Sequence, residues 1–226
     1  MSERRRFHLN LSLMTPGQLR TSWRLPDRDP VAYLNVEYFR RLVRIGQEAK
    51  LHAVLLGDSP SLGGGIETSP QAGIDPPMLF ANLSAGTEGI GFVATSTATY
   101  NDPYNLARRY LALDHLTGGR GGVNVVTTFA PDAAANFGLA APPAKEERYR
   151  RAHEFLEVIT KLWGAWDDDA VVGDRVSGRW ADPGKVHAID HHGELFDVRG
   201  PLSIPSSPQG RPVIVQAGGS DGGLSP

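Results

Sequence analysis

Short apolar runs alternate with longer amphipathic segments along most of the chain. The first run alternates apolar with polar residues, whereas the later runs are almost continuously apolar, as strands buried on both faces of a parallel sheet are. The predicted strands are Phe7–Met14, Ala53–Leu56, Ile90–Val93, Val123–Val126 and Val213–Ala217. The predicted helices between them are Val36–Lys50, a segment through Met78–Leu83 that follows Asp75-Pro76-Pro77, Pro103–Leu116 and Glu146–Trp163.

This alternation of strands and helices predicts a parallel sheet with right-handed crossovers, for which two architectures are open. One is an open doubly wound sheet, whose dinucleotide-binding form carries Gly-x-Gly-x-x-Gly directly after the first strand. Here the first strand runs into Thr15-Pro16 instead. The glycine cluster Gly118–Gly122 precedes a strand, which indicates a helix cap and a tight turn. The α/β fold predicted is therefore the other one, a TIM-type (β/α) barrel.

A barrel of this type has eight strands, but the pattern provides only about five. Between the last predicted helix and the last predicted strand lies a hairpin-like insertion around residues 167–210, with strand candidates Val186–Ile189 and Leu195–Val198. Long loops, visible in the 26 glycines and 17 prolines, use much of the remaining length. We expect residues 1–226 to form a single N-terminal portion of a barrel that is truncated after about five strands.

The charge balance and the missing cysteines narrow the functional classes. With 23 basic and 25 acidic residues and a net charge of −2, nothing points to nucleic acid as a partner. The count of 0 Cys excludes disulfides, thiolate nucleophiles and cysteine-ligated metals. Arg4-Arg5-Arg6 lacks the apolar stretch that follows in an export signal, and no segment is apolar enough to span a bilayer. We expect a cytoplasmic protein with no membrane partner.

Small polar residues gather where the predicted strands end, which in a parallel barrel is the edge that carries the active site. They are Asp58 after the second strand, Thr95–Thr97 at the third, Thr127 and Thr128 at the fourth, and Gly218-Gly219-Ser220 after the fifth. Hydroxyls and backbone N–H groups suit a ligand with a polar heterocycle and a phosphate. The alternative is that these residues only cap the helices that follow. A hydrolase is disfavoured, because these ends carry neither a Gly-x-Ser-x-Gly elbow nor a pair of carboxylates.

Three histidines lie close together in the insertion. His187, His191 and His192 have a spacing that suits metal ligation only on a helix. Asp190 and Gly193 indicate a turn instead. No metal site is therefore predicted.

Several longer strings resemble one known family. They are Leu113-Asp114-His115-Leu116-Thr117-Gly118-Gly119-Arg120, Asn124-Val125-Val126-Thr127, Asn136-Phe137-Gly138, Glu147-Arg148-Tyr149, Phe155-Leu156-Glu157-Val158, Lys185-Val186-His187, His191-His192-Gly193, Phe196-Asp197-Val198-Arg199-Gly200-Pro201 and Gln216-Ala217-Gly218-Gly219-Ser220. In this order, and over nearly the whole chain, they resemble the bacterial-luciferase-like flavin monooxygenases. The branch is the one that contains nitrilotriacetate monooxygenase component A, dibenzothiophene-sulfone monooxygenase and long-chain alkane monooxygenase.

The resemblance implies a TIM-type barrel that binds reduced FMN supplied by a separate NAD(P)H:flavin reductase. It also implies that O2 is a co-substrate, that a small organic substrate is oxidised at carbon, nitrogen or sulfur, and that a complete barrel forms a homo-oligomer. The missing dinucleotide fingerprint fits this scheme, since the reductase would use the NAD(P)H. The barrel would hold the flavin, exclude water and place the substrate beside it.

The resemblance also implies which residues bind the cofactor, although it names no catalytic residue. Asp58 and Thr95 match positions that contact the flavin rings, and Asn124 lies in the fourth-strand motif beside them. Tyr149 and Ser220 match positions that contact the phosphate end.

Gly218 stands in the same motif as Ser220 and is predicted to bind the cofactor with it. Two other positions depart from the family's pattern. Lys145 stands where the family usually has His, and a cation is compatible with a phosphate; Val123 replaces an aromatic residue. The match ends at Asp221-Gly222-Gly223, where relatives continue into the rest of the barrel. The alternative to an active monooxygenase is therefore a non-catalytic half-barrel that is inactive without the missing C-terminal strands.

Overall fold

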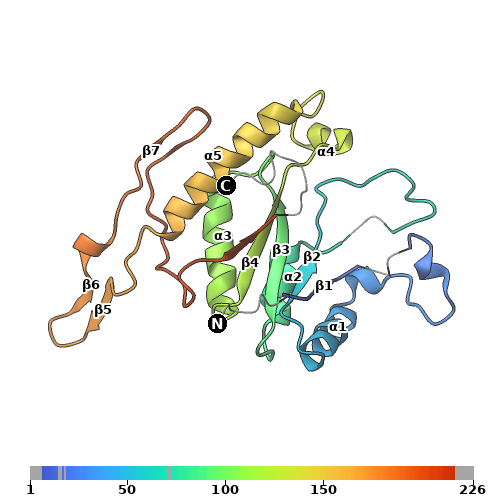
Figure 1. Cartoon of the computed structure of the whole chain (residues 1–226), viewed down its shortest axis with the longest axis horizontal. Coiled ribbons are helices and arrows are strands. Elements are labelled where there is room, and N and C mark those ends of the chain that lie inside the picture. Colours follow the sequence, from blue (N-terminus) through green and yellow to red (C-terminus); the bar gives the residue numbers. More distant parts are fainter. Residues whose placement is uncertain (1–6, 15–16, 18, 71–72, 217–226) are drawn as a thin grey trace, which may run out of the picture.

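A five-stranded parallel sheet lies at the centre of the computed structural model, which describes residues 7–14, 17, 19–70 and 73–216 (Figure 1). Every neighbouring pair of strands is parallel. The strands lie in the order β1 (Asn10–Ser12), β2 (Ala53–Leu56), β3 (Gly91–Thr97), β4 (Gly121–Val126) and β9 (Val213–Val215). The predicted α/β class with a parallel sheet is thus confirmed.

The helices that follow β1, β2 and β3 begin at residues whose side chains cap them. Asn35 accepts a hydrogen bond from the Glu37 amide (3.0 Å), and Asp102 accepts one from the Asn105 amide (3.0 Å). The helices are α1 (Val36–Glu48), α2 (Pro76–Leu83), α3 (Pro103–Leu116), α4 (Pro131–Asn136) and α5 (Lys145–Trp163), with short 3-10 turns at Ser22–Arg24, Ala32–Leu34 and Pro183–Lys185. The main predicted helices are confirmed to within two residues at their ends, and the short α4 was not predicted.

Alternate residues of β3 pack against the helices and form the core. The Phe92 ring lies 5.3 Å from that of Phe80 on α2, measured between centroids. Ser96 bonds the Tyr110 hydroxyl of α3 at 2.9 Å, and the same hydroxyl donates to Ala94 O. Because successive strand residues point to opposite faces, Val93, Thr95 and Thr97 lie on the other face, which we call the inner face.

On the inner face the neighbouring strand contributes Gly122 and Asn124. A Cβ on Gly122 would lie 3.3 Å from Val93 Cγ2 and 3.0 Å from Val213 O, so any other residue would crowd both neighbouring strands. β4 starts at Gly121, two residues before the predicted strand, because Gly121 and Gly122 pair with Phe92 and Val93 of β3. The prediction of a turn holds only for Gly118 and Gly119, whose φ angles are +66° and +79°.

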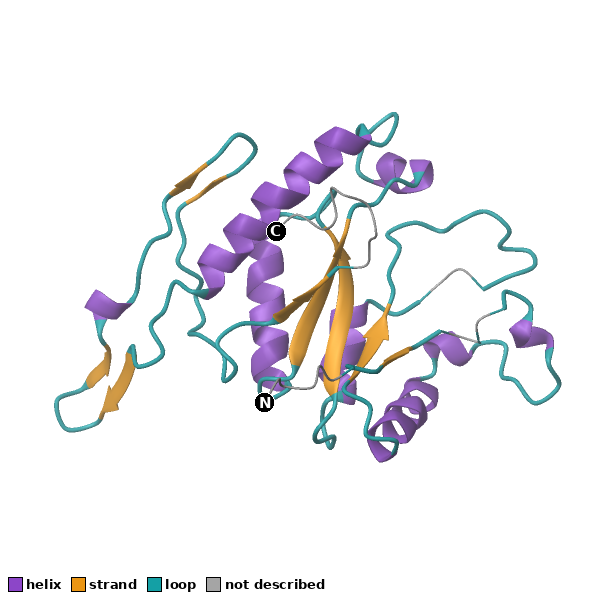
Figure 2. Ribbon diagram, viewed as in Figure 1, coloured by secondary structure: helices purple, strands orange, loops and turns teal. Residues whose placement is uncertain are grey.

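A long connection, residues 164–212, joins α5 to β9 and extends away from the sheet (Figure 2). It carries two antiparallel hairpins, β5 (Val171–Asp174) with β6 (Arg179–Ala181) and β7 (His191–His192) with β8 (Asp197–Val198). The insertion was predicted, but its first hairpin was not. The second hairpin is shifted relative to the predicted pairing of Val186–Ile189 with Leu195–Val198.

Three strand lengths also differ from the prediction. β1 covers only Asn10–Ser12, and β9 ends at Val215. β3 continues to Thr97 because it stays paired with β4 up to Val126. Within the described ranges, no helix is both long enough and apolar enough to cross a bilayer.

Candidate functional site

The carboxyl ends of β3 and β4 place Thr95 beside Asn124 on the inner face. The two residues are register partners, and Asn124 Nδ2 donates to Thr95 Oγ1 at 3.0 Å. Both side chains are buried, with exposures of 3 % and 6 %. Asn124 Oδ1 is also buried and has no hydrogen-bond partner among the described residues. An unpaired buried carbonyl oxygen is costly, so this position suits a donor from a bound molecule.

The neighbouring hydroxyls serve the fold instead. Ser96 points to the helix layer, where it bonds Tyr110. Thr97 Oγ1 accepts from the Thr99 amide (3.1 Å) and the Thr128 amide (3.3 Å), and so joins the loops that follow β3 and β4. Thr97 thus has a structural role between two loops, and the cap of the helix that follows, α3, is Asp102 instead.

Asp58 follows β2 and lies at the rim of a cavity of about 670 Å³. Its side chain reaches solvent. The protein packed around it, and then the nearby carboxylate of Asp75, raise the pKa of Asp58, while a hydrogen bond from the Ser59 amide opposes that rise. Asp58 thus adds a negative potential at this edge of the sheet.

Lys145 and Tyr149 lie on the first turns of α5, which begins at the end of the molecule where β3 and β4 finish (Figure 1). Lys145 Nζ lies 5.7 Å from the centroid of the Tyr149 ring. The structure therefore pairs Thr95 with Asn124 and Lys145 with Tyr149. The predicted site residues Gly218 and Ser220 lie outside the described residues.

Three further polar groups, on the loop after β3 and on α5, are not among the site residues predicted from the sequence. Thr99 Oγ1, Tyr100 OH and Arg148 Nε are buried and have no hydrogen-bond partner within the described ranges. The Tyr100 ring stacks on Phe137, with centroids 4.6 Å apart and planes at 5°. The Glu-Arg-Tyr string pointed to Arg148, but no pattern distinguished Tyr100.

Arg151 fixes the loop that carries Thr99 and Tyr100. Its Nε donates to Ala98 O and its Nη2 to Asn101 O, both at 3.0 Å. Burial lowers the pKa of Arg151, and Asp102 and Glu154 oppose this fall, so the guanidinium remains charged. The charge also lies 4.5 Å from the centroid of the Phe196 ring in the second hairpin. The long connection therefore contacts a residue that holds the end of β3 in place.

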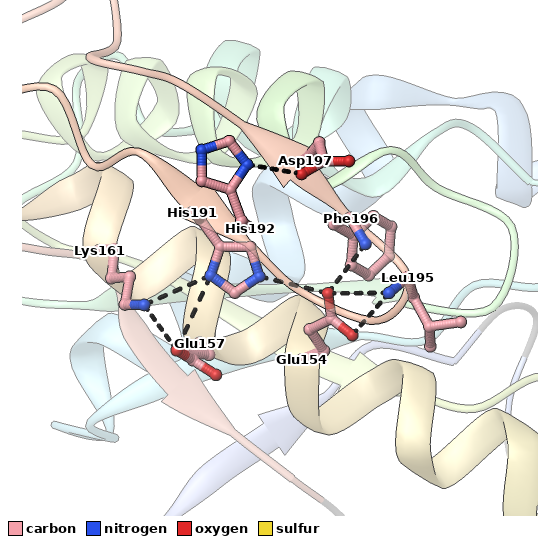
Figure 3. Close-up of polar contacts among 8 residues, drawn as sticks. All are labelled: Glu154, Glu157, Lys161, His191, His192, Leu195, Phe196 and Asp197. Atoms are coloured by element: carbon pink, nitrogen blue, oxygen red, sulfur yellow. Dashed lines mark hydrogen bonds and ion pairs between the residues drawn. The ribbon is translucent and has the colours of Figure 1, made fainter.

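Glu154 on α5 anchors the second hairpin, β7 with β8, through hydrogen bonds (Figure 3). Its carboxylate accepts from the Leu195 amide (3.0 Å), the Phe196 amide (2.8 Å) and His191 Nε2 (3.2 Å). Lys161 Nζ, which can only donate, lies 3.3 Å from His191 Nδ1, so His191 accepts at Nδ1 and donates from Nε2.

The histidines of the insertion therefore pair with carboxylates in this structure. His192 contacts Asp197 at 2.8 Å, and His187 contacts Asp167 at 3.1 Å. In the part of the chain that the structure describes, no three His, Cys, Asp or Glu side chains are grouped to hold a metal ion. The cluster around Glu154 is an attachment between a helix and a hairpin.

Comparison with known proteins places this parallel sheet and its polar carboxyl edge in a flavoenzyme family. The profile of the luciferase-like monooxygenases matches residues 17–225, and the chain belongs to that family. Within it, the chain falls in the branch of the nitrilotriacetate, dibenzothiophene-sulfone and long-chain alkane monooxygenases. The family uses FMN.

The relatives are about twice as long as this chain. N-acetyl-S-(2-succino)cysteine monooxygenase of Bacillus subtilis (strain 168) is 37% identical over 222 residues, which are 98% of this chain and 50% of the relative. Nitrilotriacetate monooxygenase component A of Aminobacter aminovorans is 38% identical over 235 residues, 99% of this chain and 52% of the relative. The crystal structure of long-chain alkane monooxygenase superposes with a TM-score of 0.88 at 36% identity, over 98% of this chain and 54% of that one. The chain thus spans about half the length of the relatives it matches.

Proposed function

We propose that this chain forms the cofactor-binding half of a monooxygenase that uses reduced FMN and O2 to oxidise a small organic substrate. The observation that carries the proposal is the Thr95–Asn124 pair on the inner face, whose Asn124 Oδ1 is buried and unpaired among the described residues. An isoalloxazine ring offers both an N–H donor and carbonyl acceptors. Asn124 Oδ1 would accept from that N–H, and the Thr99 and Tyr100 hydroxyls would donate to ring or ribityl oxygens.

The positive groups on α5 fit the phosphate end of the same cofactor. Arg148 Nε is a buried donor with no partner in the described ranges. Lys145 lies one turn before it, at the start of the helix, where the backbone N–H groups also favour an anion. Tyr149, Gly218 and Ser220 complete this set by their match to the family's motifs.

When bound, reduced FMN would supply the electrons that activate O2. The residues of this chain would bind and orient the ring from one side through Thr95 and Asn124. Val93, which is 6% exposed on the inner face, would help to exclude water from it. A transiently bound NAD(P)H:flavin reductase would deliver the cofactor. The name of one relative, nitrilotriacetate monooxygenase component A, supports such a two-component system.

Asn124→Ala tests the proposal directly. We expect it to weaken FMN binding about tenfold or more, because it removes a buried hydrogen-bonding group from the ring site. Quenching of flavin fluorescence on titration with the full chain measures the affinity, and thermal melting checks that the variant folds. Asn105→Ala, at an exposed position on α3, is the matched control. Equal FMN affinity for wild type and Asn124→Ala, or no binding by the wild type, would refute the proposal.

A second candidate is a half-barrel that binds FMN without turning over a substrate. Its supporting observation is that the chain spans 50% of the length of a relative that it otherwise matches along 98% of its own. Reduced flavin supplied by a reductase distinguishes the two functions. An active monooxygenase converts O2 into oxidised substrate and water, whereas a binding module leaves the substrate unchanged.

A further inference from the structure

The cavity beside Asp58 is built from the ends of β1 and β2 and the loop that follows β2. Most of its walls are apolar, with Leu13, Met14, Phe39, Leu55, Leu56, Leu62 and Ile74 among the lining residues. Asn136 of α4 closes one side by donating to Pro60 O at 3.0 Å. At about 670 Å³ the cavity has the size of a small-molecule site.

The polar residues described in the lining of the cavity include no positively charged side chain. Ser12, Ser59, Ser61 and Asn136 supply neutral groups, and Asp58 is the ionisable side chain among the described lining residues. No Arg, Lys or His stands in that described lining. The charged side chain that most affects Asp58 is another carboxylate, Asp75. The field at the mouth of the cavity is therefore negative.

We infer that this cavity takes a neutral or cationic small molecule with a largely aliphatic skeleton and excludes carboxylates and other anions. The inference rests on the proposed function, in which the cavity holds the molecule to be oxidised beside the flavin rings, so that Asp58, which matches a ring-contacting position, would border both. An anion would meet Asp58 without a counter-ion and would lose its hydration against aliphatic walls. A protonated amine or a hydroxyl would find an acceptor in Asp58, and its hydrocarbon chain would bury apolar surface.

Three probes with one skeleton test this selection: hexylamine, 1-hexanol and hexanoate, which at neutral pH are cationic, neutral and anionic. Ligand-observed NMR titrations of the full chain measure each Kd, with and without FMN. We expect hexylamine and hexanol to bind at least tenfold more tightly than hexanoate. Hexanoate binding as tightly as the other two, or no binding of any probe, would overturn the inference.

Two variants link the selection to the cavity. Asp58→Asn should reduce the preference for hexylamine over hexanoate. Leu62→Arg places a cation in the lining and should tighten hexanoate binding at least fivefold. Leu25→Arg, at a leucine that is 50% exposed and outside the lining, is the matched control. An equal effect of both arginines would show that the whole surface, rather than the cavity, selects the probe.

The same titrations separate this inference from the proposed function. If FMN binds but the order of the probes is reversed, the substrate class is wrong and the flavin site stands. If the order holds but FMN does not bind, the proposed function fails and the cavity remains a site for such molecules.

Discussion

Asp114 is a buried carboxylate that joins three segments of the chain. It lies on α3 with 0% exposure and accepts from the Gly121 amide at 2.8 Å. It also accepts from Ser207 Oγ and from Gln209 Nε2 in the long connection. A Cβ on Gly121 would come within 3.0 Å of Asp114, which explains the glycine there. The string around Asp114 and the glycines, one of those that carry the resemblance to the family, therefore maintains the fold at the start of β4.

Removing this carboxylate should destabilise the whole unit. We expect Asp114→Ala to lower the free energy of unfolding by roughly 2–4 kcal/mol, because buried donors from two segments lose their acceptor. Urea denaturation followed by circular dichroism measures the change. Asp168→Ala, at an exposed position, should change it by less than about 0.5 kcal/mol. A loss for Asp114→Ala no greater than that of the control would contradict this role.

At the scale of elements, the sequence predicts well where local chemistry decides. α3 occupies the predicted Pro103–Leu116, because Asp102 caps it and Gly118 follows it in a left-handed conformation. β2 is also as predicted, since a short continuous apolar run favours a strand in a parallel sheet. At the site, Thr95 could be predicted from the apolar pattern, because it follows the third predicted strand closely, whereas Asn124 lies inside the fourth predicted strand and was indicated only by the resemblance to the family.

Elements set by contacts between distant residues were predicted less well. The register of β7 and β8 depends on Glu154, thirty-seven residues before His191, and no spacing within the hairpin shows this contact. The glycine-rich start of β4 contradicts strand propensity and is explained only by its neighbours on α3 and β9. The burial of the Tyr100 hydroxyl likewise depends on how the loop after β3 packs, and the local sequence pattern does not determine that packing.

The attachment of the hairpin to α5 should depend on pH. Burial alone raises the pKa of Glu154, but hydrogen bonds from His191 and from the Phe196 and Leu195 amides outweigh it and hold the pKa below the ordinary 4.5. A lowered pKa means that the stabilisation is complete above that ordinary value and is lost as pH falls through the lowered one. We expect Glu154→Gln to accelerate hydrogen exchange at the Leu195 and Phe196 amides at neutral pH.

In acid the difference between wild type and Glu154→Gln should shrink, because the wild-type carboxyl is then protonated as well. Hydrogen exchange at neutral and strongly acidic pH measures both limits. Glu146→Gln, on the exposed first turn of the same helix, should match the wild type at each pH. A difference between wild type and Glu154→Gln that persists unchanged in acid would rule out this pH dependence.

At the scale of the whole molecule, β1 and β9 each have one strand neighbour in the described sheet. On β9, Val213 is 52% exposed and Ile214 is 37% exposed. Unpaired strand edges with exposed aliphatic side chains pair readily with other chains. This part of the sheet is therefore expected to associate with further protein.

We expect the purified 226-residue chain to self-associate as its concentration rises, with an increase in apparent mass on size exclusion with light scattering. Val213→Lys should shift the chain towards monomer, because a charge on an edge strand opposes pairing. Val176→Lys, at a position that is 98% exposed in the first hairpin's turn, should leave the distribution unchanged. A single monomeric peak for the wild type at every concentration would show that these edges do not associate.

The two ends of the long connection are tied to each other at Trp166. Ser206 Oγ donates to Trp166 O at 2.7 Å, and Trp166 Nε1 donates to Leu202 O at 2.9 Å. These two hydrogen bonds hold the segment that leaves α5 against the segment that returns to β9. The residues between them, including both hairpins, form a loop that these contacts close. The exposed turn between Asp174 and Arg179 lies beyond these contacts, so a change in its length should leave the path of β9 unchanged. That turn is the place to graft a peptide tag or a fluorophore onto this protein while its sheet stays intact.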